Sequence, residues 1–188
     1  MPMLSRGIAR WAAAAAVPAV LLTLAWAGLP GAASAADRPK FGKPISEAEL
    51  SAWTISIPPS GAGLPAGSST AKQGALVFAE KCQVCHGEKG AGKPADALVG
   101  GMGTLNTPKP VRTVGSYWQY ATTLFDYIRR AMPYVSPQSL TNEEAYALTA
   151  YVLFLNGIVA EDAPINATTL PQVKMPNRDG FISEWPLK

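Results

Sequence analysis

The chain has 188 residues, enough for one domain with segments to spare, and its 17 glycines and 17 prolines predict extensive loops. It carries 16 basic and 13 acidic side chains, and because two of the basic ones, Arg6 and Arg10, lie in the first ten residues, the rest is almost neutral. Such a balance argues against a nucleic-acid-binding protein, which needs a basic surface to neutralise phosphates.

Residues 1–35 have the pattern of a Sec signal peptide. A basic beginning is followed by an uncharged apolar stretch, and the small residues Ala33 and Ala35 are typical of a cleavage site. We therefore expect export to the periplasm and removal of this segment. An uncleaved segment would instead anchor the chain in the membrane. In both cases the two cysteines of the chain face an oxidising compartment.

The N-terminal extension (residues 36–69) and the C-terminal tail (residues 159–188) are expected to be largely irregular. Within the extension a short helix is expected after Ser46, which has capping-box spacing with Glu49, and a linker rich in Pro and Gly follows it. The tail has four prolines and no helical periodicity. Segments of this composition often lie along a partner protein; the alternative is that they pack on their own domain.

Two helices are predicted in the first part of the remaining chain. Apolar residues at helical spacing predict a helix over about 71–83, capped by Ser69 or Thr70. A Gly-rich loop follows. The stretch TTLFDYIRRAMP predicts a second helix, with Thr122 as its candidate cap. Pro133 would stop this helix because proline lacks an N–H and clashes with the preceding turn.

The last helix has the clearest boundaries. Thr141 and Glu144 form a capping box at its start, and Asn156 and Gly157 supply a stop at its end. No stretch alternates between apolar and polar residues well enough to predict a sheet. The sequence therefore predicts an all-α domain over residues 70–158, with an irregular extension at each end.

The stretch Cys82-Gln-Val-Cys85-His86 contains both cysteines and the one histidine of the chain. It is the attachment pattern of c-type haem, in which two thiols bind the vinyl groups of one porphyrin and the histidine binds iron. A structural zinc site needs four ligands, one more than these residues supply. A redox dithiol remains an alternative, but such pairs typically begin a helix after a strand. We predict one covalent haem c.

A methionine is the candidate for the sixth position on the iron, because the chain has no second histidine. Met132 is preferred, since it ends the second helix, precedes a proline and lies between the haem motif and the last helix. Met102 in the Gly-rich loop and Met175 in the tail are alternatives. A Met/His pair suits electron transfer. An open iron would instead suit a gas sensor or a peroxidase-like enzyme.

The order of helix, CxxCH, Gly-rich loop, helix, Met-Pro and terminal helix resembles a class I cytochrome c. In that family the first and last helices cross beside the haem, and Gly74 and Tyr151 match the residues at the crossing. The family often places a proline whose backbone carbonyl faces the haem-binding histidine. Asp96 stands at that position here, and its carbonyl can serve the same purpose because every residue carries one.

Four longer stretches narrow the resemblance, which spans about residues 47–181. They are similar to the cytochrome c subunit of bacterial sulfane and sulfite dehydrogenases, which are molybdenum enzymes. The stretches are GGMGTL, TVGSYWQYATTLFDYIRRAMPY, SLTNEEAYALTAYVLFLN and MPNRDGF.

The resemblance also implies contacts to the haem propionates from the region before the methionine-bearing helix. Arg112 offers a fork of N–H donors that suits a carboxylate, and Tyr117 and Trp118 each offer one donor together with apolar bulk. The alternative is that the two aromatic residues belong to the core and that Arg112 is a surface residue.

The function implied by the resemblance is electron transfer, with no substrate chemistry on this chain. The electron donor would be a separate molybdenum-containing subunit that oxidises sulfite or sulfane sulfur, and the acceptor a downstream cytochrome or oxidase. A free periplasmic shuttle without a dedicated dehydrogenase is the first alternative. A haem sensor or peroxidase-like enzyme is the second, and it requires an open iron.

Overall fold

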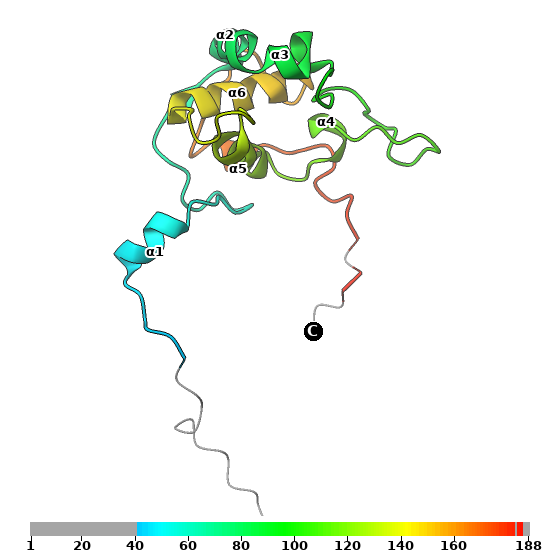
Figure 1. The fold of residues 1–188 in the computed structure, drawn as a ribbon. Coiled ribbons are helices and arrows are strands. Elements are labelled where there is room, and N and C mark those ends of the chain that lie inside the picture. The colour runs from blue at the N-terminus through cyan, green and yellow to red at the C-terminus, as the bar shows by residue number, and fades with distance from the viewer. Residues whose placement is uncertain (1–40, 183, 186–188) are drawn as a thin grey trace, which may run out of the picture. The chain divides into compact units, whose positions relative to one another are not determined.

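A computed structural model of the protein describes residues 41–182, 184 and 185 (Figure 1). The predicted signal peptide lies outside the described residues. The chain divides into two units at Pro44, and the second unit contains all of the following elements. They are α1 (Glu47–Trp53), β1 (Ser68–Ser69), α2 (Ala71–Lys81), α3 (Gln83–His86), η2 (Glu88–Gly90), α4 (Val114–Tyr117), α5 (Ala121–Ala131), α6 (Asn142–Leu155), β2 (Ile165–Asn166) and η3 (Leu170–Gln172).

The core forms where α6 lies between α2 and α5 (Figure 1). Helix α6 is apolar around most of its circumference, which is typical of a helix that is buried on several sides. Its Tyr146 is fully buried, with its ring centroid 4.4 Å from that of Phe125 on α5. Burying an apolar side chain of this size contributes about 1.5–3 kcal/mol to stability. The predicted all-α class is confirmed.

Helices α2 and α6 approach each other most closely at Gly74. A Cβ atom at this position would overlap the carbonyl oxygen of Ala147 and lie 2.7 Å from the Cβ of Tyr151. One turn further along α2, the ring of Phe78 lies 5.2 Å from that of Tyr151. The crossing of the first and last helices, which was implied by the resemblance, is thus confirmed at the two residues it named.

The ends of α2 and α6 follow the predicted capping signals. Thr141 and Glu144 form the capping box of α6, and Asn156 is its C-cap. Thr70 is the N-cap of α2. This helix ends at Lys81, slightly earlier than predicted, because the backbone leaves the helical conformation at Cys82 before α3 begins.

The predicted cap of α5 is wrong. Its N-cap is Tyr120, and Thr122 lies inside the first turn, where its hydroxyl donates a hydrogen bond to the carbonyl of Pro59 at 3.0 Å. The hydroxyl of Thr122 is used to hold the N-terminal extension, so it does not cap its own helix. A contact between residues so distant in sequence leaves no local signal.

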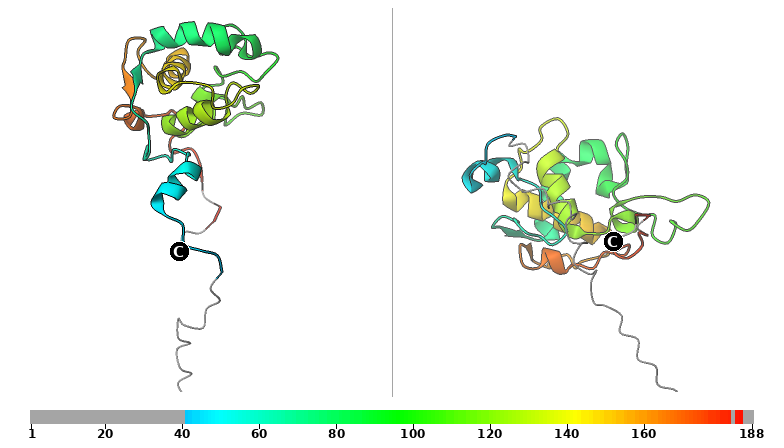
Figure 2. Two further views of the ribbon diagram at one scale, coloured as in Figure 1. Left: turned by 60° about the vertical axis from the view of Figure 1, so that its left-hand side comes forward. Right: turned by 90° about the horizontal axis from the view of Figure 1, so that it is seen from below.

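A short β-ladder joins the two chain extensions, although no sheet was predicted. Strands β1 and β2 pair antiparallel, with Ser68 opposite Asn166 and Ser69 opposite Ile165 (Figure 2). Strands of two residues are too short to show the alternation on which a prediction depends.

Both extensions also contribute side chains to the core. The buried ones are Ile57, Ile165, Leu170 and Met175. These parts of the extension and of the tail therefore pack on their own domain, as the alternative held. The side chains of Phe41, Trp53 and Ile182, nearer the ends of the described chain, are exposed.

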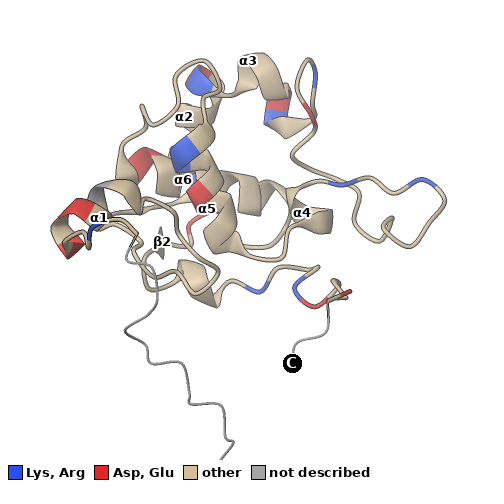
Figure 3. Cartoon of the chain, turned by 60° about the horizontal axis from the view of Figure 1, so that its bottom comes forward, with Lys and Arg blue, Asp and Glu red and all other residues tan. Residues whose placement is uncertain are grey.

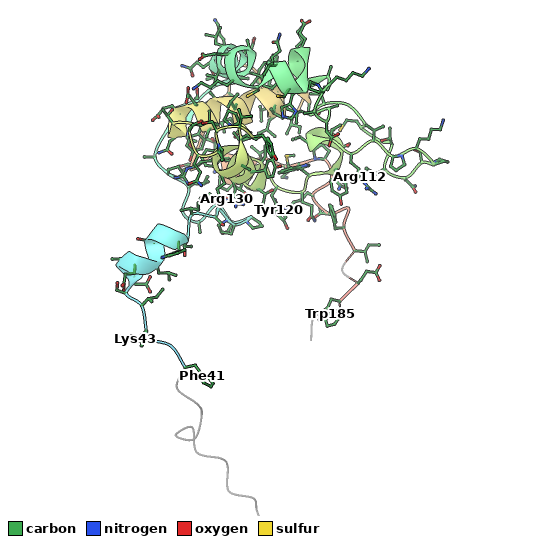
Figure 4. The ribbon with its side chains drawn as sticks, in the orientation of Figure 1. Phe41, Lys43, Arg112, Tyr120, Arg130 and Trp185 are labelled. Carbon is green, nitrogen blue, oxygen red and sulfur yellow. The ribbon has the colours of Figure 1, made fainter. Side chains whose placement is uncertain are left out.

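Asp126 anchors the N-terminal extension to α5. Its carboxylate accepts a hydrogen bond from the backbone N–H of Ile57 at 2.8 Å and hydrogen bonds from two nitrogens of the Arg130 guanidinium, the shortest at 2.6 Å. The side chain of Arg130 is labelled in Figure 4. Burial by itself raises the pKa of Asp126, but the hydrogen bonds from Arg130 and Ile57 outweigh it and leave this pKa below its usual value. None of the described helices is both long and apolar enough to cross a membrane.

Candidate haem site

A cavity of about 520 Å³, here called the central cavity, opens between α2, α3, α5 and α6. Its volume lies within the range of small-molecule sites. Most of its wall is apolar, which favours a large flat ligand that must be kept from water. The buried or half-buried apolar residues of the wall include Phe78, Leu98, Val114, Leu124, Ile128, Leu140, Leu148 and Val152.

The predicted haem-binding residues share one wall of the central cavity. The short helix α3 places His86 in the lining together with Cys85, and Cys82 joins them from the preceding turn. Cys82 is half-buried, Cys85 is exposed, and both are free thiols. The structure thus brings two thiols and one imidazole together, which is the donor set that a covalently bound haem needs.

The ring of His86 is held by the main chain of the following loop. Its Nδ1 lies 3.0 Å from the carbonyl oxygen of Asp96, the residue named by the resemblance. The loop is brought back to this point because the N–H of Gly92 donates to the His86 carbonyl and the N–H of Ala95 donates to the Cys85 carbonyl. With Nδ1 donating to a carbonyl, Nε2 is left to bind iron.

The environment of Cys82 argues against a redox dithiol. Burial raises the pKa of this thiol to about 11, and the nearby Lys81 lowers it only partly. Thiols that take part in disulfide exchange have lowered pKa values, because the thiolate is the reactive form.

The structure separates the three methionines that it describes. Met132 follows α5 directly as its C-cap and lines the central cavity with His86. Met102 is 51% exposed, Met175 is 3% exposed within the core, and neither belongs to the lining. This placement supports Met132 as the sixth ligand, which stays a prediction.

The three residues expected at the propionates have different positions. Arg112 and Trp118 line the central cavity, whereas Tyr117 does not. The ring of Tyr117 instead contacts Phe181 at 5.1 Å between centroids, with the Arg112 guanidinium 5.5 Å from its centroid. The ring of Trp118 packs edge-on against Tyr127.

Arg112 is available to bind a carboxylate. The other cationic side chain in the lining, Lys81, is paired with Glu144. Arg112 forms no ion pair with any residue that the structure describes. In addition, residues 97–125 contain Lys and Arg but no Asp or Glu, as the loop leading into α4 shows (Figure 3). This part of the cavity therefore favours an anionic group.

An exposed apolar rim at the central cavity was not predicted. Val84, Tyr134 and Val135 line the cavity, yet their side chains are 77%, 85% and 90% exposed. Val84 lies between the two cysteines, and the other two follow Met132-Pro133. Their position next to the predicted haem ligands was the signal that could have identified them.

Comparison with known proteins agrees with this reading of the site. The family described as cytochrome c oxidase, cbb3-type, subunit III, matches residues 69–152. Among solved structures, the chain is similar to the sulfane dehydrogenase SoxCD from Paracoccus pantotrophus, with 38% identity and a TM-score of 0.72. The match covers 78% of this chain and 73% of that chain. A comparison with curated proteins found no match.

Proposed function

Because the chain belongs to the c-type cytochromes, close to the cytochrome subunit of sulfane dehydrogenase, we propose that it accepts electrons from a periplasmic, molybdenum-containing dehydrogenase of sulfur compounds. Membership of the family means that the chain carries haem c covalently and transfers electrons. The similarity to SoxCD over most of both chains is the observation that carries the more specific proposal. Bound haem supplies one reversible electron.

Different residues of the central cavity have different roles in binding the haem. Cys82 and Cys85 would attach it, and His86, whose ring is oriented by the Asp96 carbonyl, would bind the iron. Met132 would be the second protein ligand, and a Met/His pair suits electron transfer rather than the binding of small ligands. The apolar wall excludes water, so little needs to rearrange when the charge of the iron changes.

Arg112 and Trp118 hold the propionate edge. Arg112 supplies the fork of N–H donors that suits a carboxylate, and Trp118 supplies its indole N–H and apolar bulk. The exposed rim of Val84, Tyr134 and Val135 surrounds the opening through which electrons enter and leave. An apolar, exposed rim suits contact with a partner protein.

The donor in this account is a separate molybdenum-containing subunit that oxidises sulfane sulfur or sulfite. The acceptor is a downstream cytochrome or oxidase. Residues 1–35 support a periplasmic location because they have the composition of a signal peptide. No bond of the sulfur compound is made or broken on this chain.

Co-purification from native cells tests the partner. The periplasmic extract is separated on two successive chromatography columns under mild conditions. Molybdenum and haem are measured in every eluted fraction. We expect the two to elute together, with one haem for each molybdenum. A haem-containing monomer separated from all molybdenum would contradict the proposal and favour a free shuttle.

A further inference from the structure

The C-terminal tail contains a segment that no part of the proposed function uses. We propose that residues 175–181, here called the C-terminal strap, position the Arg112–Trp118 corner of the central cavity and thereby set the potential of the haem. The strap is anchored at its start because Met175 is 3% exposed within the core. The N–H of Arg178 donates to the carbonyl of Met175, and this hydrogen bond closes a turn within the strap.

The strap holds the turn between α4 and α5 by two hydrogen bonds. The side-chain amide of Asn177 donates to the carbonyl of Tyr117 at 2.7 Å. The side-chain amide of Gln119 donates to the carbonyl of Arg178 at 3.1 Å. The tail therefore donates one hydrogen bond to the turn and accepts one from it, between residues that are 60 and 59 positions apart in sequence.

Two ring contacts add to these hydrogen bonds. The Arg178 guanidinium lies 4.3 Å from the ring centroid of Tyr120, the N-cap of α5. At this distance a cation is attracted to the face of an aromatic ring. The side chain of Tyr120 is labelled in Figure 4. The ring of Phe181 meets that of Tyr117 nearly edge-on. Every residue from Tyr117 to Tyr120 except Trp118 therefore contacts the strap through one of these interactions.

The turn between α4 and α5, which the strap contacts, determines the positions of Arg112 and Trp118 in the cavity. Trp118 is the C-cap of α4, at the start of the turn, and lines the central cavity. Arg112 lines it too, and its guanidinium lies over the same Tyr117 ring that Phe181 contacts. Tyr117 therefore acts on the cavity indirectly, as a positioning residue between the strap and Arg112.

A loosened turn would change the surroundings of the haem in a definite direction. If Arg112 and Trp118 move away, water enters this side of the central cavity and the positive charge of Arg112 is withdrawn. Both changes favour the ferric form, which carries one more positive charge, so the midpoint potential falls. The inference rests on the bound haem and not on the identity of the electron donor.

Two pairs of variants test it in the full haem-loaded protein. Phe181→Ala removes the ring contact, and Ile182→Ala is its control, because Ile182 is an exposed apolar neighbour. Arg178→Ala removes the cation over Tyr120. Lys174→Ala removes the same charge from an exposed residue of the tail that has no partner among the described residues. Midpoint potential, thermal unfolding and amide hydrogen exchange of residues 112–120 are measured for each.

We expect Phe181→Ala and Arg178→Ala to lower the midpoint potential and to speed exchange of residues 112–120 at least about threefold. The controls should match the unmodified protein, and Arg178→Lys should recover most of the loss, since lysine also places a cation over the ring. An unchanged potential in both test variants would overturn the proposal. An equal shift in the controls would overturn it as well, because a general loss of charge or bulk from the tail would then be the cause.

Discussion

The carbonyl oxygen of Asp96 lies 3.0 Å from Nδ1 of His86. If His86 binds the iron as proposed, this contact would fix the plane of the imidazole and raise its strength as a ligand, as hydrogen bonds to a coordinating histidine generally do. Because the acceptor is a main-chain atom, the contact depends on the path of the loop rather than on the side chain at position 96. Gly92 and Ala95 set that path by returning hydrogen bonds to His86 and Cys85.

Asp96→Ala should therefore preserve the ligation of the iron by His86. The absorption spectra of the oxidised and reduced protein are expected to be unchanged, because the alanine carbonyl occupies the same place. The potential should rise slightly, since a negative charge next to the cavity is removed. Loss of the low-spin spectrum would show that the carboxylate, and not the carbonyl, supports the histidine.

Met132→Ala should open the sixth position of the iron. We expect a high-spin component in the spectrum, binding of carbon monoxide by the reduced protein, and a lower midpoint potential, because thioether sulfur favours ferrous haem. Met102→Ala is the matched control, since Met102 is exposed and outside the central cavity. If Met102→Ala opens the iron and Met132→Ala does not, the ligand assignment is wrong.

Met175→Ala should affect stability and not the spectrum. Met175 is buried in the core away from the central cavity, and replacing a buried methionine with alanine costs about 2–5 kcal/mol. Denaturant titration of the haem-loaded protein measures this loss. A changed iron spectrum in the folded variant would indicate that Met175 reaches the haem after all.

Gly74→Ala should destabilise the crossing of α2 and α6. The added methyl group would overlap the Ala147 carbonyl and crowd the Cβ of Tyr151, so we expect a loss of at least about 1–3 kcal/mol. Lys72→Ala, at an exposed position of the same helix, should change stability by less than about 0.5 kcal/mol. Equal stability of the two variants, measured by thermal unfolding, would contradict the close approach of the helices.

Asp126→Asn should weaken the hydrogen bonds that join Ile57 of the N-terminal extension and Arg130 to position 126 of α5. We expect the free energy of unfolding to fall by about 1–3 kcal/mol at neutral pH. The pKa of Asp126 is lowered in the folded protein. Its contribution is therefore present above the pKa of the unfolded chain and is lost as the pH falls through the lower folded value. Denaturant titrations at pH 7 and pH 3 should show a difference between variant and parent that shrinks at the lower pH. A difference independent of pH would rule out a role for the charge.

Local signals account for most of what the sequence predicted correctly. The capping boxes at Ser46 and Thr141 and the attachment motif at Cys82 each lie within a few residues, so they can be read without the fold. The errors concern contacts between distant segments. The hydroxyl of Thr122 donates a hydrogen bond to the carbonyl of Pro59 and so does not cap α5. The β1–β2 ladder joins residues almost a hundred positions apart.

The position of Tyr117 was beyond sequence reasoning for a related reason. It ends the four-residue helix α4, which is too short for its periodicity to show which side chains face inward. Its neighbour Trp118 enters the central cavity, whereas Tyr117 turns to Phe181 in the tail. Only the fold shows that the MPNRDGF stretch contacts the region predicted to bind the propionates.

The central claim is that electrons from a sulfur compound reach this haem through a molybdenum-containing subunit. Stopped-flow spectroscopy on the complex isolated from the periplasm tests it most directly, with the haem absorption followed after addition of sulfite or of thiosulfate with its carrier proteins. The account predicts reduction of the haem within the turnover time of the complex, and no reduction when the cytochrome chain is mixed with the sulfur compound alone. A haem that stays oxidised while the molybdenum subunit turns over with an artificial acceptor would contradict it.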